Sequence, residues 1–145
     1  MFKIISIDPG KCKCGLVMVD LNQKKVDQAL VLDTEFLPKY LKTLNTVENI
    51  SKVLIGNGTT CKQNIEKLES IKQDLIIVEE KNTTLRAKKR YFELFPIRGL
   101  KKFLPKEIFI INKNLDAVSA LIILEDYCSY KFTLSEDIDT KTWLK

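Results

Sequence analysis

Three short apolar runs near the start of the chain constrain its fold more than any other feature. They cover residues 2–8, 15–21 and 26–32, and they are rich in β-branched and other apolar residues. The first run stops at Pro9-Gly10, a pair that typically turns the chain. Because only short connections separate the runs, we expect a meander of three antiparallel strands.

Beyond the meander, the spacing of apolar residues alternates between the helix period and the strand period. The spacing predicts, in order, a helix at 35–44, a strand at 50–55, a helix to about residue 71, a strand at 74–79 and helices at 82–95 and 115–127. Alternating strands and helices favour parallel pairing through right-handed crossovers. We therefore expect an α/β protein with a mixed five-stranded sheet, in which parallel strands extend the meander and helices flank both faces.

Several local features refine these elements. Thr34 is a plausible N-cap for the helix at 35–44, and Pro38 is tolerable only in its first turn. Thr59 or Thr60 could cap the next helix. The run at 74–79 is apolar throughout, which is typical of a strand covered on both faces. The helix at 115–127 is apolar nearly all round and should therefore be buried, whereas residues 96–113 look like a loop with one strand-like piece at 108–111.

Length and composition favour one globular domain. We assign residues 1–130 of the 145 to it and leave the structure of the tail, residues 131–145, open because its signals are weak. A composition of 45% hydrophobic and 30% charged residues excludes disorder and a membrane protein. The chain starts with a strand and a turn where a secretory signal would carry an apolar segment, so we expect a cytoplasmic protein that does not bind membranes.

The cysteines and the charges narrow the possible partners. Cys12, Cys14, Cys61 and Cys128 occur in a chain without an export signal, so free thiols are expected, and the absence of histidine disfavours a zinc site. The formal charge of +5 is concentrated in residues 86–106, which carry eight basic residues and one acid. This distribution fits an anionic partner.

Acidic residues stand in unusual settings at three places. Asp8 ends the first apolar strand, the pair Glu79-Glu80 ends an equally apolar one, and Asp116 begins the apolar helix. Each has an ordinary explanation, which we favour for any one of them alone: a turn residue, a solvated strand end and a helix cap. If the strand ends and the helix start converge, the carboxylates would repel one another unless a cation is bound. Oxygen ligands without histidine or thiolate then indicate Mg²⁺ or Mn²⁺.

Three segments also resemble, in the same order, the motifs of the YqgF family of the RNase H-like superfamily, which includes the RuvC-type Holliday junction resolvases. They are residues 7–17, 78–87 and 115–125, and the stretch 90–105 resembles the cyanobacterial members in particular. The resemblance implies an RNase H-like fold. It also selects Glu80 over Glu79 as the partner of Asp8 and Asp116, so that these three residues are the expected metal ligands and catalytic groups.

The sequence departs from the family pattern at three places, one of which is the first turn, where Lys11-Cys12-Lys13-Cys14 stands in place of the usual lysine–arginine pair. The family's Asp-Glu-Arg is here Glu79-Glu80-Lys81, and Ser119 stands where RuvC-type resolvases carry a fourth acid. The three expected ligands remain, whereas the choice of substrate and the catalytic competence stay open.

The implied activity is a metal-dependent nuclease for structured RNA, with maturation of the precursor of 16S ribosomal RNA as the leading assignment. A resolvase of branched DNA and a catalytically silent nucleic-acid-binding module are the alternatives, and both a monomer and a homodimer remain open. Two metal ions would activate a water molecule for in-line attack on the phosphodiester.

The side chains expected to contact phosphates lie in the first turn and on the helix at 82–95; they are Lys11, Lys13, Arg86, Lys89 and Arg90. A merely solvated helix face explains the three on the helix equally well. Tyr91 and Phe92 could stack on bases, but at helical spacing such aromatic residues are more often part of the core.

Overall fold

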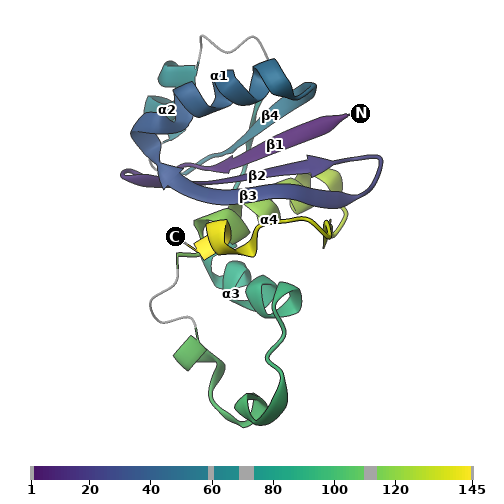
Figure 1. The fold of residues 1–145 in the computed structure, drawn as a ribbon. Coiled ribbons are helices and arrows are strands. Elements are labelled where there is room, and N and C mark those ends of the chain that lie inside the picture. The colour runs from purple at the N-terminus through teal and green to yellow at the C-terminus, as the bar shows by residue number, and fades with distance from the viewer. Residues whose placement is uncertain (1, 59–60, 69–73, 110–113, 145) are drawn as a thin grey trace.

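The computed structural model describes residues 2–58, 61–68, 74–109 and 114–144. Its centre is one mixed sheet with the strand order β5-β4-β1-β2-β3-β6 and helices on both faces (Figure 1). The strands are β1 Lys3–Asp8, β2 Lys13–Asp20, β3 Lys25–Asp33, β4 Ile50–Gly56, β5 Asp74–Val78 and β6 Thr133–Leu134. The expected α/β class and mixed sheet are confirmed, but the described residues form six strands instead of five.

The pairing of the strands brings several strand ends to one edge of the sheet. β1, β2 and β3 form the expected antiparallel meander, and Asp8 at the end of β1 pairs with Gly15. β4 and β5 join β1 in parallel, and Gly56 at the end of β4 pairs with Val78. Because parallel strands end at the same edge, residues that follow β1, β4 and β5 gather there.

Among the described residues, four α-helices flank the sheet. They are α1 Leu37–Val47, α2 Cys61–Leu68, α3 Thr83–Leu94 and α4 Asp116–Cys128. The same residues form four short 3₁₀ helices: η1 Thr34–Phe36, η2 Gly99–Phe103, η3 Lys106–Phe109 and η4 Thr140–Leu144. α1 and α2 lie on one face of the sheet, and α4 lies on the other with α3 outside it (Figure 1).

The strands supply side chains to a separate core on each face. Successive residues of a strand point to opposite faces. Ile5 and Ile7 therefore pack with Leu37 of α1, whereas Ile4 packs with the residues of α4. α4 is buried continuously from residue 117 to residue 125, which confirms the expected buried helix.

Two sequence expectations about strands are wrong. β5 is not covered on both faces: it lies at the edge of the described sheet, and Ile77 remains 55% exposed. The expected strand-like piece at 108–111 is helical where the structure describes it, since Ile108 and Phe109 belong to η3, and residues 110–111 lie outside the described residues.

The expected cap of the first helix is also wrong. The Thr34 hydroxyl does not cap a helix but donates a hydrogen bond to the Gly10 carbonyl at 3.0 Å, which ties the end of β3 to the turn after β1. Pro38 does lie in the first turn of α1, as expected. The predicted cap of α2, Thr59 or Thr60, falls outside the described residues.

The tail, which the sequence left open, packs on the sheet. β6 pairs in parallel with the start of β3, and Phe132 and Trp143 are buried in the same core as α4. The Trp143 ring meets Phe95 edge-on at 5.7 Å between centroids. Large aromatic side chains bury enough apolar area to hold such a short segment against the protein.

No helix in the described part of the chain is both long and apolar enough to span a membrane.

We expect Trp143→Ala to lower the free energy of unfolding by about 3 to 5 kcal/mol, because it leaves a cavity beneath β3. Lys141→Ala in the same 3₁₀ helix is the control and should change stability little, because residue 141 is exposed. Urea unfolding followed by circular dichroism measures both. Equal stability of the two variants would show that the tail is not part of the folded core.

Candidate metal centre

Asp8 and Asp116 approach each other because α4 begins directly against β2. Asp8 is the last residue of β1 and pairs with Gly15. A Cβ atom on Gly15 would coincide with the backbone of Asp116 and lie 2.5 Å from the Ala117 nitrogen. Only glycine at this position therefore allows the first turn of α4 to come so close to the sheet.

The Glu80 side chain folds back over the end of β4. A Cβ atom on Gly56 would fall inside its carboxyl group and 2.8 Å from Cδ1 of Ile123. A Cβ atom on Gly58 would lie 3.6 Å from Glu80 Oε1 and 3.7 Å from the Pro9 carbonyl oxygen, so the carboxylate reaches toward the turn after β1. Gly56 thus provides the space for this side chain. Nothing in the sequence had pointed to this role of Gly56.

The two neighbouring glutamates lie in different surroundings. Glu79 is exposed and forms an ion pair with Lys81 at 3.6 Å. Glu80 Oε1 is buried and has no hydrogen-bond partner among the described residues. An unpaired buried carboxylate oxygen costs free energy unless a ligand satisfies it. The structure therefore turns Glu80, and not Glu79, toward the end of β1.

The surroundings of Asp8 strongly disfavour its ionised form. Burial first, then the charges of Glu80 and Asp116 and a hydrogen bond with Glu80 raise the pKa of Asp8 to about 7, against a smaller opposing effect of the Ser119 hydroxyl. Burial also raises the pKa of Glu80, which the hydrogen bond from Asp8 partly offsets. Both carboxyl groups thus favour the protonated form more than a solvated carboxyl group does.

Asp116 lies at the margin of this pair. Its backbone N–H donates to Asn114 Oδ1 at 2.9 Å, which fixes the start of α4. Burial raises the pKa of Asp116, while hydrogen bonding with Asn114 and the positive charge of Lys13 lower it. Lys13 therefore lies close enough to this carboxylate to stabilise its charge.

The donor set agrees in its chemistry with a hard divalent cation. Three carboxylates supply only oxygen ligands, and Glu80 contributes a buried oxygen without a partner. Within the described ranges, however, no group of three or more Asp, Glu, Cys or His side chains is placed so that it could already hold a metal ion. Asp8 and Glu80 are paired, and Asp116 would have to draw closer to share a cation with them.

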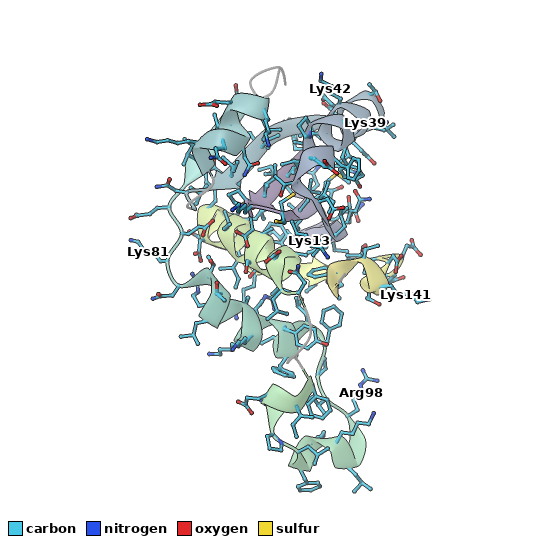
Figure 2. All side chains as sticks on the ribbon, turned by 90° about the vertical axis from the view of Figure 1, so that its left-hand side faces the viewer. Lys13, Lys39, Lys42, Lys81, Arg98 and Lys141 are labelled. Carbon is cyan, nitrogen blue, oxygen red and sulfur yellow. The ribbon has the colours of Figure 1, made fainter. Side chains whose placement is uncertain are left out.

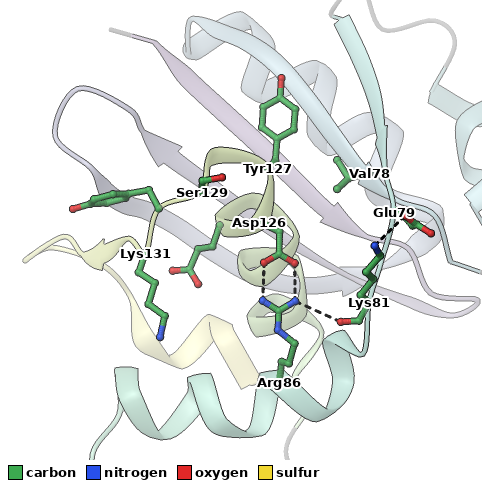
Figure 3. Close-up of a pocket in the computed structure, with 10 residues that line it drawn as sticks. Val78, Glu79, Lys81, Arg86, Asp126, Tyr127, Ser129 and Lys131 are labelled. Carbon is green, nitrogen blue, oxygen red and sulfur yellow. Dashed lines mark hydrogen bonds and ion pairs between the residues drawn. The ribbon is translucent and has the colours of Figure 1, made fainter.

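The basic residues expected to contact phosphates fall into two groups. Lys11, Lys13 and Lys89 are exposed, and Lys13 projects near the start of α4 (Figure 2). Arg86 instead forms a two-pronged ion pair with Asp126, with N···O distances of 2.6 and 2.7 Å, in a surface pocket beside the end of β5 (Figure 3).

Arg90 does not fit its expected role. Its guanidinium is buried and donates to both carboxylate oxygens of Glu125, at 2.6 and 3.1 Å, and to the Phe132 carbonyl at 2.7 Å. Glu125 Oε1 in turn accepts from the Phe132 N–H at 2.9 Å. Arg90 therefore joins α3, α4 and the tail, and its fork is not available to a phosphate.

Tyr91 lies in the core, and the described cysteines are free thiols. Tyr91 is buried and stacks edge-on with Phe92 at 5.2 Å between centroids, so it belongs to the core. Cys12, Cys14 and Cys128 are free thiols, as expected, and the side chain of Cys61 lies outside the described part of the chain.

The fold was compared with known proteins. No protein-family model matches the chain, and no curated protein matches it. Among solved structures it is similar to T. thermophilus RuvC in complex with a Holliday junction substrate, with a TM-score of 0.50, 9% identity and coverage of 89% of this chain and 96% of that one.

Two other solved structures are more distant. The ROK hexokinase from Thermus thermophilus gives a TM-score of 0.42 at 13% identity over 62% of this chain and 37% of that one. An Aquifex aeolicus Ppx/GppA phosphatase gives 0.40 at 11% identity, over 66% and 42%. The likeness to RuvC shows the fold alone: the chain has a mixed α/β fold of the RuvC-like RNase H type.

We expect Gly56→Ala to lower the free energy of unfolding by about 1 to 3 kcal/mol, because the new methyl group displaces the Glu80 carboxylate. Gly58→Ala is the matched control, since its methyl group would make only ordinary contacts. Adding Glu80→Ala to Gly56→Ala should restore part of the loss. Urea unfolding of the four proteins measures this, and an equal loss in both glycine variants would contradict the placement of Glu80.

We expect the metal-free protein to lose stability as the pH rises. Because the pKa of Asp8 is raised to about 7 in the folded state, its contribution is fully present below about pH 4, the pKa of an unfolded aspartate, and is lost on the way to pH 7. Asp8→Asn removes this dependence and should be more stable than the parent at pH 8 by about 2 to 4 kcal/mol.

Urea unfolding in EDTA at pH 5 and pH 8 measures this difference. Glu79→Gln serves as the control. Because Glu79 is exposed, its substitution should leave the dependence of stability on pH unchanged. A parent protein that is as stable at pH 8 as Asp8→Asn would show that Asp8 is not buried against other carboxylates.

Proposed function

We propose that this chain is a divalent-metal-dependent nuclease that hydrolyses phosphodiester bonds in structured nucleic acid. The observation that carries the proposal is the buried Asp8–Glu80 pair, with an unpartnered oxygen on Glu80, at the sheet edge where α4 brings in Asp116. Such a pair destabilises the protein by itself, as expected for groups arranged for a ligand. The RuvC-like fold supports the proposal.

Asp8, Glu80 and Asp116 would hold Mg²⁺ or Mn²⁺. A cation there would supply Lewis-acid activation of water and neutralise the phosphate charge. Because the raised pKa of Asp8 disfavours the ionised form that a cation requires, activity should increase with pH toward neutrality and above. Ser119 donates to Asp8 and would keep its carboxylate oriented.

Lys11 and Lys13 would position the substrate. Both are exposed in the segment that directly follows Asp8 and leads into β2, and Lys13 already acts on the charge of Asp116. Lys89 on α3 is a third exposed cation. Arg90 is left out of the proposal because its guanidinium is occupied within the protein, and Arg86 would first have to leave Asp126.

RNA is the favoured substrate on the resemblance of the sequence motifs to the YqgF family, and processing of the 16S ribosomal RNA precursor is the corresponding cellular role. The cytoplasm is the corresponding compartment. Two observations favour other candidates. The RuvC structure was solved with a Holliday junction substrate, which favours branched DNA. The described residues hold no group already able to bind a metal, which favours a silent binding module.

We expect cleavage of a labelled RNA hairpin in Mg²⁺, and none in EDTA. Asp8→Asn and Asp116→Asn should each lower the rate at least about a hundredfold, since even indirect partners of metal ligands contribute 10- to 100-fold. Glu79→Gln is the matched control and should retain the parental rate. A four-way DNA junction is assayed in parallel, and gel electrophoresis of the products is the measurement.

Each outcome separates the candidates. Cleavage of the junction alone would identify a resolvase, and tight binding without cleavage of either substrate would identify a silent module. Cleavage that survives Asp8→Asn would overturn the proposed site.

A further inference from the structure

A projecting segment between α3 and α4 has no role in the carboxylate site. It comprises residues 96–109, includes η2 and η3, and is called the arm below. Figure 1 and Figure 2 show it extending away from the body on the far side of α3. α3 ends at Leu94 ahead of Pro96, which cannot continue a helix, and Gly99 takes a positive φ of 71° in open space. The chain is thus turned outward at this point.

The arm exposes apolar side chains that a folded protein ordinarily buries. Leu100 and Phe103 are each 87% exposed, and Ile108 is 55% exposed. Its turns are closed by its own backbone, with the Leu104 N–H bonded to the Lys101 carbonyl at 3.1 Å. Lys106 Nζ, 5.5 Å from the centre of the Phe92 ring, ties the arm to α3. Exposed apolar side chains clustered in this way indicate an interaction surface.

Positive charge accompanies these apolar side chains. The basic residues of the arm are Arg98, Lys101, Lys102 and Lys106, and its one acid is Glu107. The net +3 of the arm, four minus one, is more than half of the net +5 of the chain. A partner that carries both dense negative charge and flat apolar faces fits this surface, and unpaired nucleotides have both properties.

The arm is also near enough to the carboxylates to act on the same molecule. It ends at Phe109, and α4 begins at Asp116, so six residues, or seven Cα–Cα steps, connect them. Seven steps span at most about 25 Å. A DNA duplex rises about 3.4 Å per base pair, so this reach corresponds to about seven base pairs of DNA.

We propose that the arm is a second nucleic-acid contact, in which Phe103 and Leu100 stack on or wedge beside unpaired bases while Lys101 and Lys102 hold the adjacent phosphates. The inference rests on the proposed function for the nature of the substrate, but it requires no cleavage. It assigns the arm to recognition of a junction between paired and unpaired nucleotides, since exposed aromatic and aliphatic side chains open or occupy such steps.

Binding is measured in EDTA, so that it does not depend on catalysis. The probe is a fluorescein-labelled RNA hairpin with a 3′ overhang, and fluorescence anisotropy gives its dissociation constant. We expect Phe103→Ser to weaken binding about tenfold, in line with the loss of one stacked base. We expect Lys101→Gln/Lys102→Gln to weaken binding and to reduce the slope of log K against log salt by about 2.

Matched controls come from α1, on the opposite face of the sheet. Val47→Ser removes another highly exposed apolar side chain, since Val47 is 75% exposed. Lys39→Gln/Lys42→Gln removes two exposed charges far from the arm (Figure 2). Both controls should change the dissociation constant less than twofold. All substituted side chains are exposed, and thermal unfolding verifies that each variant folds.

Stacking is read directly by 2-aminopurine placed in the overhang. The parent protein should quench its fluorescence and Phe103→Ser should not. Arm variants that bind and quench like the parent would overturn the inference. A parental dimer that Phe103→Ser converts to a monomer with unchanged affinity would also overturn it and would assign the arm to self-association.

The outcomes for the arm and for the nuclease are distinguishable. Loss of binding in the arm variants with no cleavage by the parent supports the arm and rejects the nuclease. Parental cleavage with unchanged binding in the arm variants rejects the arm alone.

Discussion

The packing of α4 across the sheet is the constraint on which the rest of the structure depends. Nearly every residue of the helix from 117 to 125 is apolar and buried, and its first turn contacts the backbone of Gly15. This one contact determines the depth of the core on that face. It also determines where Asp116 stands relative to Asp8, so the stability of the fold and the geometry of the candidate site have the same origin.

The positive charges of the chain divide between structure and surface. Arg90 is used inside the protein, where it satisfies Glu125 and the backbone of the tail. A buried ion pair of this kind is expensive to desolvate, and removal of one partner leaves the other charge unpaired. Lys11, Lys101 and Lys102 are instead exposed at the surface. The basic residues of the chain therefore have two uses. Arg90 joins three segments inside the protein, and these exposed lysines form two separate surfaces that attract an anion.

The carboxylates of the candidate site destabilise the folded protein. Burial raises the pKa values of Asp8, Glu80 and Asp116, and the charges of the other two carboxylates raise that of Asp8 further, so each group disfavours the folded state at neutral pH. Gly56 makes room for one of them, because a Cβ atom at this position would overlap the Glu80 carboxyl group. Stability given up at one point and compensated by a well-packed core is common at functional sites.

The sequence by itself determined the meander, the alternation that follows it and the buried α4, because apolar periodicity reports which face of an element is covered. It also singled out Asp8 and Asp116, since each stands where an apolar element begins or ends. Tertiary structure alone decided that β5 is an edge strand, that Arg90 is buried and that Trp143 anchors the tail, because each depends on residues distant in the chain. The choice of Glu80 over Glu79 rested on the family resemblance, and only the structure gives it a physical reason. Both follow the same strand, and only the space above Gly56 turns Glu80 inward.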